Sequence, residues 1–157
     1  NLDTLVQKNY QLLWQTGKYY FNEAKKIAED HHSKSIVVTE FIDRMDLAYA
    51  LADVIISRAG AIAISEICLV AKPPVFVPLP SAAEDHQTKN AKALVENEAG
   101  ILIPQNEAEE KIGITVRDLL NDKALQKKIC ENLNKLAVKD SADLIANEII
   151  KLTTIKN

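Results

Sequence analysis

The chain has 157 residues, 47 % of which are hydrophobic, and carries a net charge of −3 at pH 7. This length suits a single domain with a sizeable core, and the hydrophobic content excludes an intrinsically disordered chain. The slight excess of acidic residues argues against a non-specific nucleic-acid-binding protein, which needs a basic surface. The sequence has no apolar run of about 18 residues, the length that would indicate a transmembrane helix.

Strands and helices are predicted to alternate along the chain. Short apolar or β-branched runs predict strands over residues 11–15, 35–39, 54–57, 75–79 and 101–103. Helical spacing predicts helices over 20–30, 43–52 with Asp43 as its cap, 61–71 and 88–97, after a helix end at 2–8. From residue 107 onward the pattern is helical, over 107–121, 123–137 and 140–153. This order predicts an α/β fold, a Rossmann-like parallel sheet with helices on both faces, closed by C-terminal helices.

The stretch from Asp53 to Ala91 organises the domain. Two buried strands flank the helix at 61–71, and polar residues follow each strand, at 57–60 and at 81–90. Ligands of open parallel sheets bind outside the carboxyl ends of the strands. Both polar clusters are therefore expected on one edge of the sheet, close enough to share a ligand.

Two features of the first cluster suit a nucleotide. Gly60-Ala61 forms a strand-to-helix turn whose backbone N–H groups and helix dipole favour a diphosphate, although small residues there also serve tight packing. Glu66 lies farther along a helix that is apolar nearly all round. A carboxylate there could accept both hydroxyls of a ribose, and on the buried side of the helix it would need a partner. The alternative is a solvated helical glutamate.

The remaining polar candidates leave alternatives open. Arg58 either neutralises a diphosphate or pairs with Asp85 or Glu84. In the second cluster, donors and acceptors suited to sugar hydroxyls come from His86, Gln87 and Asn90, while helix capping or solvent exposure is the other interpretation of His86.

The segments SRAGAIAISEI at 57–67 and DHQTKNA at 85–91 resemble the MurG family of peptidoglycan glycosyltransferases. The resemblance covers essentially the whole chain, but only the carboxyl-terminal half of those enzymes. It implies the C-terminal half of a glycosyltransferase B fold and one domain over 1–157. A first strand with a glycine-rich turn is expected before residue 1. The full-length enzyme would be an inverting hexosyltransferase that moves N-acetylglucosamine (GlcNAc) from UDP-GlcNAc to lipid I, forming lipid II in peptidoglycan synthesis.

The resemblance also implies the donor site. Glu66 would bind the ribose, the Ile42 backbone would pair with the uracil edge beside Phe41, and Gln87 would contact the GlcNAc hydroxyls. Without the resemblance, Phe41 and Ile42 would be read as core residues. The complete set of expected UDP-GlcNAc contacts is Phe41, Ile42, Arg58, Gly60, Ala61, Ile62, Ala63, Ile64, Ser65, Glu66, His86, Gln87 and Asn90.

No catalytic residue, metal site or cofactor is expected in this chain. The sequence shows no nucleophile arrangement, P-loop or metal-ligand cluster, and Cys68 and Cys130 are interpreted as small buried residues in a reducing cytosol. The resemblance assigns three things to the amino-terminal half: the catalytic base, the lipid I site, and peripheral attachment to the cytoplasmic face of the bacterial inner membrane. The chain alone is therefore expected to be inactive. Two alternatives remain: a UDP-GlcNAc-binding subunit of a split glycosyltransferase, or a non-catalytic UDP-sugar-binding module.

Overall fold

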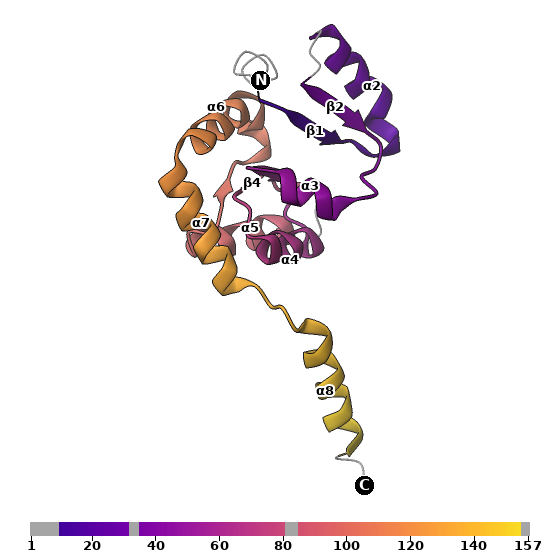
Figure 1. The fold of residues 1–157 in the computed structure, drawn as a ribbon, viewed down its shortest axis with the longest axis vertical. Coiled ribbons are helices and arrows are strands. Elements are labelled where there is room, and N and C mark those ends of the chain that lie inside the picture. Colours follow the sequence, from indigo (N-terminus) through magenta and orange to yellow (C-terminus); the bar gives the residue numbers. More distant parts are fainter. Residues whose placement is uncertain (1–9, 32–34, 81–84, 155–157) are drawn as a thin grey trace.

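The computed structural model describes residues 10–31, 35–80 and 85–154. Their strands are β1 (Leu12–Gln15), β2 (Ile36–Thr39), β3 (Ile55–Ser57), β4 (Pro74–Phe76) and β5 (Ile101–Leu102). All of the strand pairs are parallel, which confirms the predicted α/β class (Figure 1). The predicted helix end at 2–8 lies outside the described residues.

The strands form two sheets. In the first sheet, β1 pairs with β2, with Leu12 opposite Ile36. In the second, β4 lies between β3 and β5, with Ser57 opposite Phe76 and Phe76 opposite Leu102. Within the described residues no strand joins β1 to β3, so the parallel ladder is interrupted at this point.

The helices match the predicted ones with small shifts at their ends. They are α2 (Gly17–Asp30), α3 (Met45–Leu51), α4 (Ala61–Val70), α5 (His86–Glu96), the 3-10 helix η2 (Gln105–Glu107), α6 (Ala108–Asn121), α7 (Lys123–Leu136) and α8 (Ser141–Thr154).

Three predicted helix starts were wrong. Helix α2 begins at Gly17 rather than at residue 20. Asp43 does not cap α3: the cap position is Arg44, whose carbonyl accepts the N–H groups of Leu47 and Ala48, and no side chain caps the helix. Helix α5 begins at His86 rather than at residue 88. It starts directly after Asp85, whose left-handed backbone (φ 58°) turns the chain into the helix.

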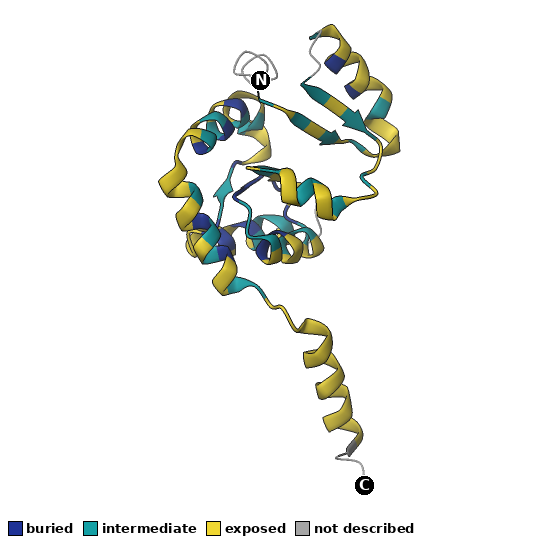
Figure 2. Cartoon of the chain, viewed as in Figure 1, coloured by how far each residue is buried: buried dark blue, intermediate teal, exposed yellow. Residues whose placement is uncertain are grey.

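The core lies around β4. Val75 and Phe76 are fully buried, as expected for the middle strand of a parallel sheet. Helix α4 contributes Ile67, and α7 contributes Ile129 and Leu133. Figure 2 shows these buried residues gathered around the second sheet. Cys68 is buried in the core, as predicted, whereas Cys130 is only half-buried; both are free thiols.

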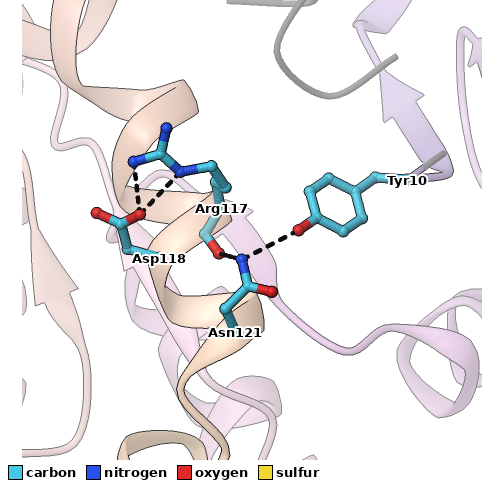
Figure 3. A network of polar contacts seen from close by, with 4 residues as sticks. All are labelled: Tyr10, Arg117, Asp118 and Asn121. Carbon is cyan, nitrogen blue, oxygen red and sulfur yellow. Dashed lines mark hydrogen bonds and ion pairs between the residues drawn. The ribbon is translucent and has the colours of Figure 1, made fainter. Parts of the chain in front are cut away.

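The first sheet is tied to the second through the start of β1. Tyr10 and Leu12 pack against the core of the second sheet. The Tyr10 hydroxyl accepts a hydrogen bond of 3.3 Å from Asn121 Nδ2 on α6, beside the Arg117–Asp118 ion pair (Figure 3). Strand β1 is thus the strand of its sheet that contacts the rest of the domain.

Helix α8 projects away from the body of the domain in Figure 1, and its residues 141–153 are all exposed (Figure 2). Among the residues that the structure describes, no helix has both the length and the apolar character needed to cross a membrane.

Candidate functional site

The turn between β3 and α4 forms the base of the site. Gly60 is the cap residue of α4 and has an extended backbone (φ −69°, ψ 148°). Apart from its chain neighbours, a Cβ atom added to Gly60 would meet no atom of the described residues within 4 Å, so these residues leave the space beside the helix start open. The first amide N–H groups of a helix have no partner within the helix, and they carry the positive end of its dipole. This arrangement favours an anion such as a phosphate.

Hydrogen bonds hold the neighbouring chain ends around this turn. Arg58 Nη1 donates to the carbonyl of Val77 at 2.8 Å, to that of Pro78 at 3.3 Å and to Gln105 Oε1. Asn90 Nδ2 donates to the Ala59 carbonyl at 3.2 Å. These contacts confirm that the segments following β3 and β4 lie on one edge, as predicted from the parallel order.

The guanidinium of Arg58 is held by neighbouring chain segments in the structure. It donates to two backbone carbonyls and a side-chain amide, and among the described residues it forms no ion pair with Asp85, so its role toward a diphosphate stays a prediction. Glu84, the other suggested partner, lies outside the described residues. Sequence reasoning did not identify Gln105, because it follows β5 and lies 47 residues farther along the chain.

Glu66 has a partner that the sequence did not reveal. Its side chain is exposed rather than on the buried side of α4, and Oε2 accepts a hydrogen bond of 2.9 Å from the hydroxyl of Tyr49 on α3. Tyr49 is half-buried and packs against the core. The sequence feature that could have identified Tyr49 is that it is the one polar side chain in an otherwise small and aliphatic segment, LAYALA.

Burial, together with the hydrogen bond and the negative charge of Glu66, raises the pKa of Tyr49 to about 12. Because the folded state favours the protonated phenol, the stability gained from this preference is complete below the ordinary tyrosine pKa of about 10 and is lost as the pH rises through about 12. We expect one of the four tyrosines to ionise late when phenolate absorbance is followed against pH. Glu66→Gln should move that late component toward lower pH, and Tyr49→Phe should remove it. A late component unchanged in Tyr49→Phe would contradict this assignment.

The expected sugar-contacting residues lie at the start of α5. His86 is exposed at its first position, and the half-buried Gln87 follows. Gln87 Oε1 accepts a hydrogen bond of 2.9 Å from the Leu79 N–H, so this side chain supports the chain after β4. Its amide nitrogen is the atom left to meet a ligand hydroxyl.

Gln87→Ala is expected to weaken UDP-GlcNAc binding by about 1 kcal/mol, the typical contribution of one neutral hydrogen bond, with a smaller loss for UDP. Titration calorimetry with both ligands measures the difference. Gln87→Glu keeps an acceptor for the Leu79 N–H and removes the amide donor, but its negative charge near the proposed diphosphate should weaken both ligands. Equal losses for UDP and UDP-GlcNAc in Gln87→Ala would show that Gln87 supports only the backbone.

The expected uracil-binding residues lie after β2. Phe41 is 67 % exposed, which excludes a core role, and Ile42 is half-buried. The Ile42 N–H donates to Gln15 Oε1 at 2.9 Å, and Thr39 Oγ1 donates to the Phe41 carbonyl at 2.8 Å. Gln15, the last residue of β1, was not identified from the sequence. These two hydrogen bonds link Phe41 and Ile42 to the first sheet rather than to the α4 turn.

The expected contacts on the first turns of α4 differ in exposure. Ala61, Ile62 and Ser65 are exposed, Ile62 to 78 %, while Ala63 and Ile64 are half-buried. The Ser65 hydroxyl donates to the Ala61 carbonyl at 3.0 Å, within the helix. In the part of the chain that the structure describes, no group of three His, Cys, Asp or Glu side chains could hold a metal ion.

The model of the glycosyltransferase family 28 C-terminal domain matches residues 1–145. The chain belongs to glycosyltransferase family 28. The β3–α4 turn and the start of α5 both lie inside the range that matches the family 28 domain.

Relatives of this family 28 domain share the name UDP-N-acetylglucosamine–N-acetylmuramyl-(pentapeptide) pyrophosphoryl-undecaprenol N-acetylglucosamine transferase. The protein from Bacteroides thetaiotaomicron is 47 % identical over 99 % of the chain, and the one from Flavobacterium psychrophilum is 42 % identical over 96 %. The chain spans only 42 % and 40 % of their lengths. The crystal structure of Acinetobacter baumannii MurG aligns with a TM-score of 0.81 and 29 % identity, over 94 % of this chain and 44 % of that one.

Proposed function

We propose that this domain binds UDP-GlcNAc as the donor half of an inverting transferase that moves GlcNAc to lipid I and forms lipid II. The observation that supports it best is the open α4 start at Gly60, with Glu66 one to two turns farther along the same helix. The name that the relatives share is consistent with this donor and acceptor.

Each part of the proposed donor has a candidate partner. The diphosphate lies at the start of α4, where the helix dipole also stabilises it as the leaving group, and this needs no metal ion. Glu66 accepts the ribose hydroxyls. Gln87, His86 and Asn90 face the sugar, and Arg58 holds the strand ends that frame the site. When the nucleotide binds, the Ile42 N–H donates its hydrogen bond to the uracil edge instead of to Gln15 Oε1.

The remaining functions belong to the part of the relatives that this chain does not match. We propose that this part supplies the catalytic base, the lipid I site and the peripheral attachment to the cytoplasmic face of the inner membrane. This division is supported by the coverage of the relatives, of which the chain spans about two fifths.

We also propose that a further parallel strand completes the domain between β1 and β3. The observed order, β2-β1 and then β3-β4-β5, matches the doubly wound order 3-2-1-4-5-6 with its first strand absent. Strand β1 is the one that contacts the second sheet, which supports this placement. In a longer protein containing that strand, hydrogen exchange should slow at amides of β1 and β3. Unchanged exchange would contradict the placement.

The chain alone is expected to bind UDP or UDP-GlcNAc weakly and to transfer no sugar. The reason is that the proposed donor-binding residues lie in this chain, whereas the catalytic base and the acceptor site are proposed to lie outside it. Calorimetry measures binding, and chromatography of radiolabelled lipid products measures lipid II formation. Turnover by the chain alone would contradict the half-site assignment. The longer protein should transfer GlcNAc; binding without transfer there would favour a non-catalytic UDP-sugar module.

A further inference from the structure

Tyr49 comes from a different helix than the residue that it contacts. It lies on α3, 17 residues before Glu66, and its hydroxyl donates to Glu66 Oε2 at 2.9 Å. Resting on the proposed function, in which Glu66 binds the ribose, we propose that Tyr49 is a positioning residue for the donor. It holds one oxygen of the Glu66 carboxylate, which leaves Oε1 as the acceptor for a ribose hydroxyl.

This role requires a fixed donor and a mobile acceptor, and Tyr49 and Glu66 differ in this way. The Tyr49 ring packs against the core of the second sheet, so the position of its hydroxyl is set by buried neighbours. Glu66 is exposed, and a long exposed side chain without a partner samples several rotamers. A hydrogen bond from a fixed donor restricts those rotamers before the ligand arrives, which lowers the entropy that is lost on binding.

The chemistry of the pair also suits a carboxylate acceptor. Glu66 accepts from Tyr49 only while the phenol keeps its proton, as a tyrosine does throughout the neutral range, and the raised pKa of Tyr49 extends this to higher pH. An ionised carboxylate has acceptor sites for several donors, so one hydrogen bond from Tyr49 leaves capacity for the hydroxyls of a ribose.

A purely structural role is the competing explanation. In that case the hydrogen bond would only join α3 to α4, and its loss would lower stability and affect every ligand equally. The positioning role predicts instead a loss that depends on the ribose hydroxyls. The two explanations therefore separate when ligands with and without those hydroxyls are compared.

The test compares UDP with 2′,3′-dideoxy-UDP on the wild-type chain and on Tyr49→Phe. We expect Tyr49→Phe to weaken UDP binding roughly three- to tenfold, the range of one hydrogen bond, and to leave dideoxy-UDP binding unchanged. Tyr20→Phe is the matched control, because Tyr20 is 59 % exposed on α2. When Glu66→Gln is already present, adding Tyr49→Phe should lower the logarithm of the UDP affinity by less than half of what Tyr49→Phe does in the wild-type chain.

Three outcomes would overturn the inference. If Tyr49→Phe loses the same affinity for UDP as for dideoxy-UDP, Tyr49 has a structural role. If the UDP affinity of Tyr49→Phe equals that of the wild type, Glu66 needs no positioning. If the wild-type chain binds no UDP at all, the proposed function fails together with this inference. If the wild type binds UDP and loses affinity in Glu66→Gln but not in Tyr49→Phe, only the positioning role is wrong. Thermal unfolding of each variant shows whether it is folded.

Discussion

Gly60→Asp is expected to remove most UDP binding while the domain stays folded. The new carboxylate would stand at the cap of α4, where the proposed diphosphate lies. At a separation of about 5 Å and an effective dielectric constant of about 20, two unit charges repel by roughly 3 kcal/mol, which corresponds to more than a hundredfold loss of affinity. The fold should tolerate the change because a Cβ at this position meets no atom of the described residues within 4 Å, its chain neighbours aside.

Stability and binding should change independently in this variant. Aspartate is a favoured cap residue and differs from glycine there by only a few tenths of a kcal/mol, so the unfolding midpoint should hold or rise slightly. Gly60→Asn is the matched control, with nearly the same shape and no charge. Titration calorimetry with UDP compares the two. Equal affinity losses in both variants would indicate a steric effect, and unchanged affinity in Gly60→Asp would place the diphosphate elsewhere.

Glu66→Gln is expected to weaken UDP binding by about 1.5–3 kcal/mol, the range for hydrogen bonds to a charged group. The amide keeps the shape of the side chain but loses the charge that strengthens hydrogen bonds to the ribose hydroxyls. The unfolding midpoint should change little because Glu66 is exposed. Calorimetry with UDP measures the loss.

The matched control is Glu23→Gln, which removes the charge of an exposed glutamate from α2. It should leave UDP affinity within error of the wild type, so that a general effect of net charge is separated from a local one. A UDP affinity in Glu66→Gln equal to that in Glu23→Gln would return Glu66 to an ordinary solvated helical residue.

Local sequence patterns were sufficient for most of the secondary structure. The apolar run at Val75 and Phe76 predicted a buried strand, and helical spacing predicted α4 with its end displaced by one residue. These predictions hold because periodicity and turn residues act over a few neighbouring positions. The start of α5 was predicted two residues late, since the left-handed backbone at Asp85 that begins the helix has no comparable pattern.

The parallel order of strands also predicted that two polar segments would share an edge, and the Asn90–Ala59 contact confirms it. This prediction needed no side-chain geometry, because the carboxyl ends of parallel strands always meet on one side. The positions of Gly60 and Glu66 on α4 follow from the chain in the same way. Their roles toward a nucleotide rest on the resemblance and on the experiments above.

Side-chain partners across the domain emerged only when the chain was folded. Tyr49 reaches Glu66 across 17 residues, Gln15 reaches the Ile42 N–H across 27, and Arg58 reaches Gln105 across 47. Each contact depends on how two elements pack and on which rotamer each side chain adopts, and neither is encoded in local spacing. The interruption between β1 and β3 was not predicted for the same reason, because strand pairing is a contact between segments that are distant in sequence. The alternation of strands and helices along the chain indicates that the strands are parallel, but not which strands are neighbours.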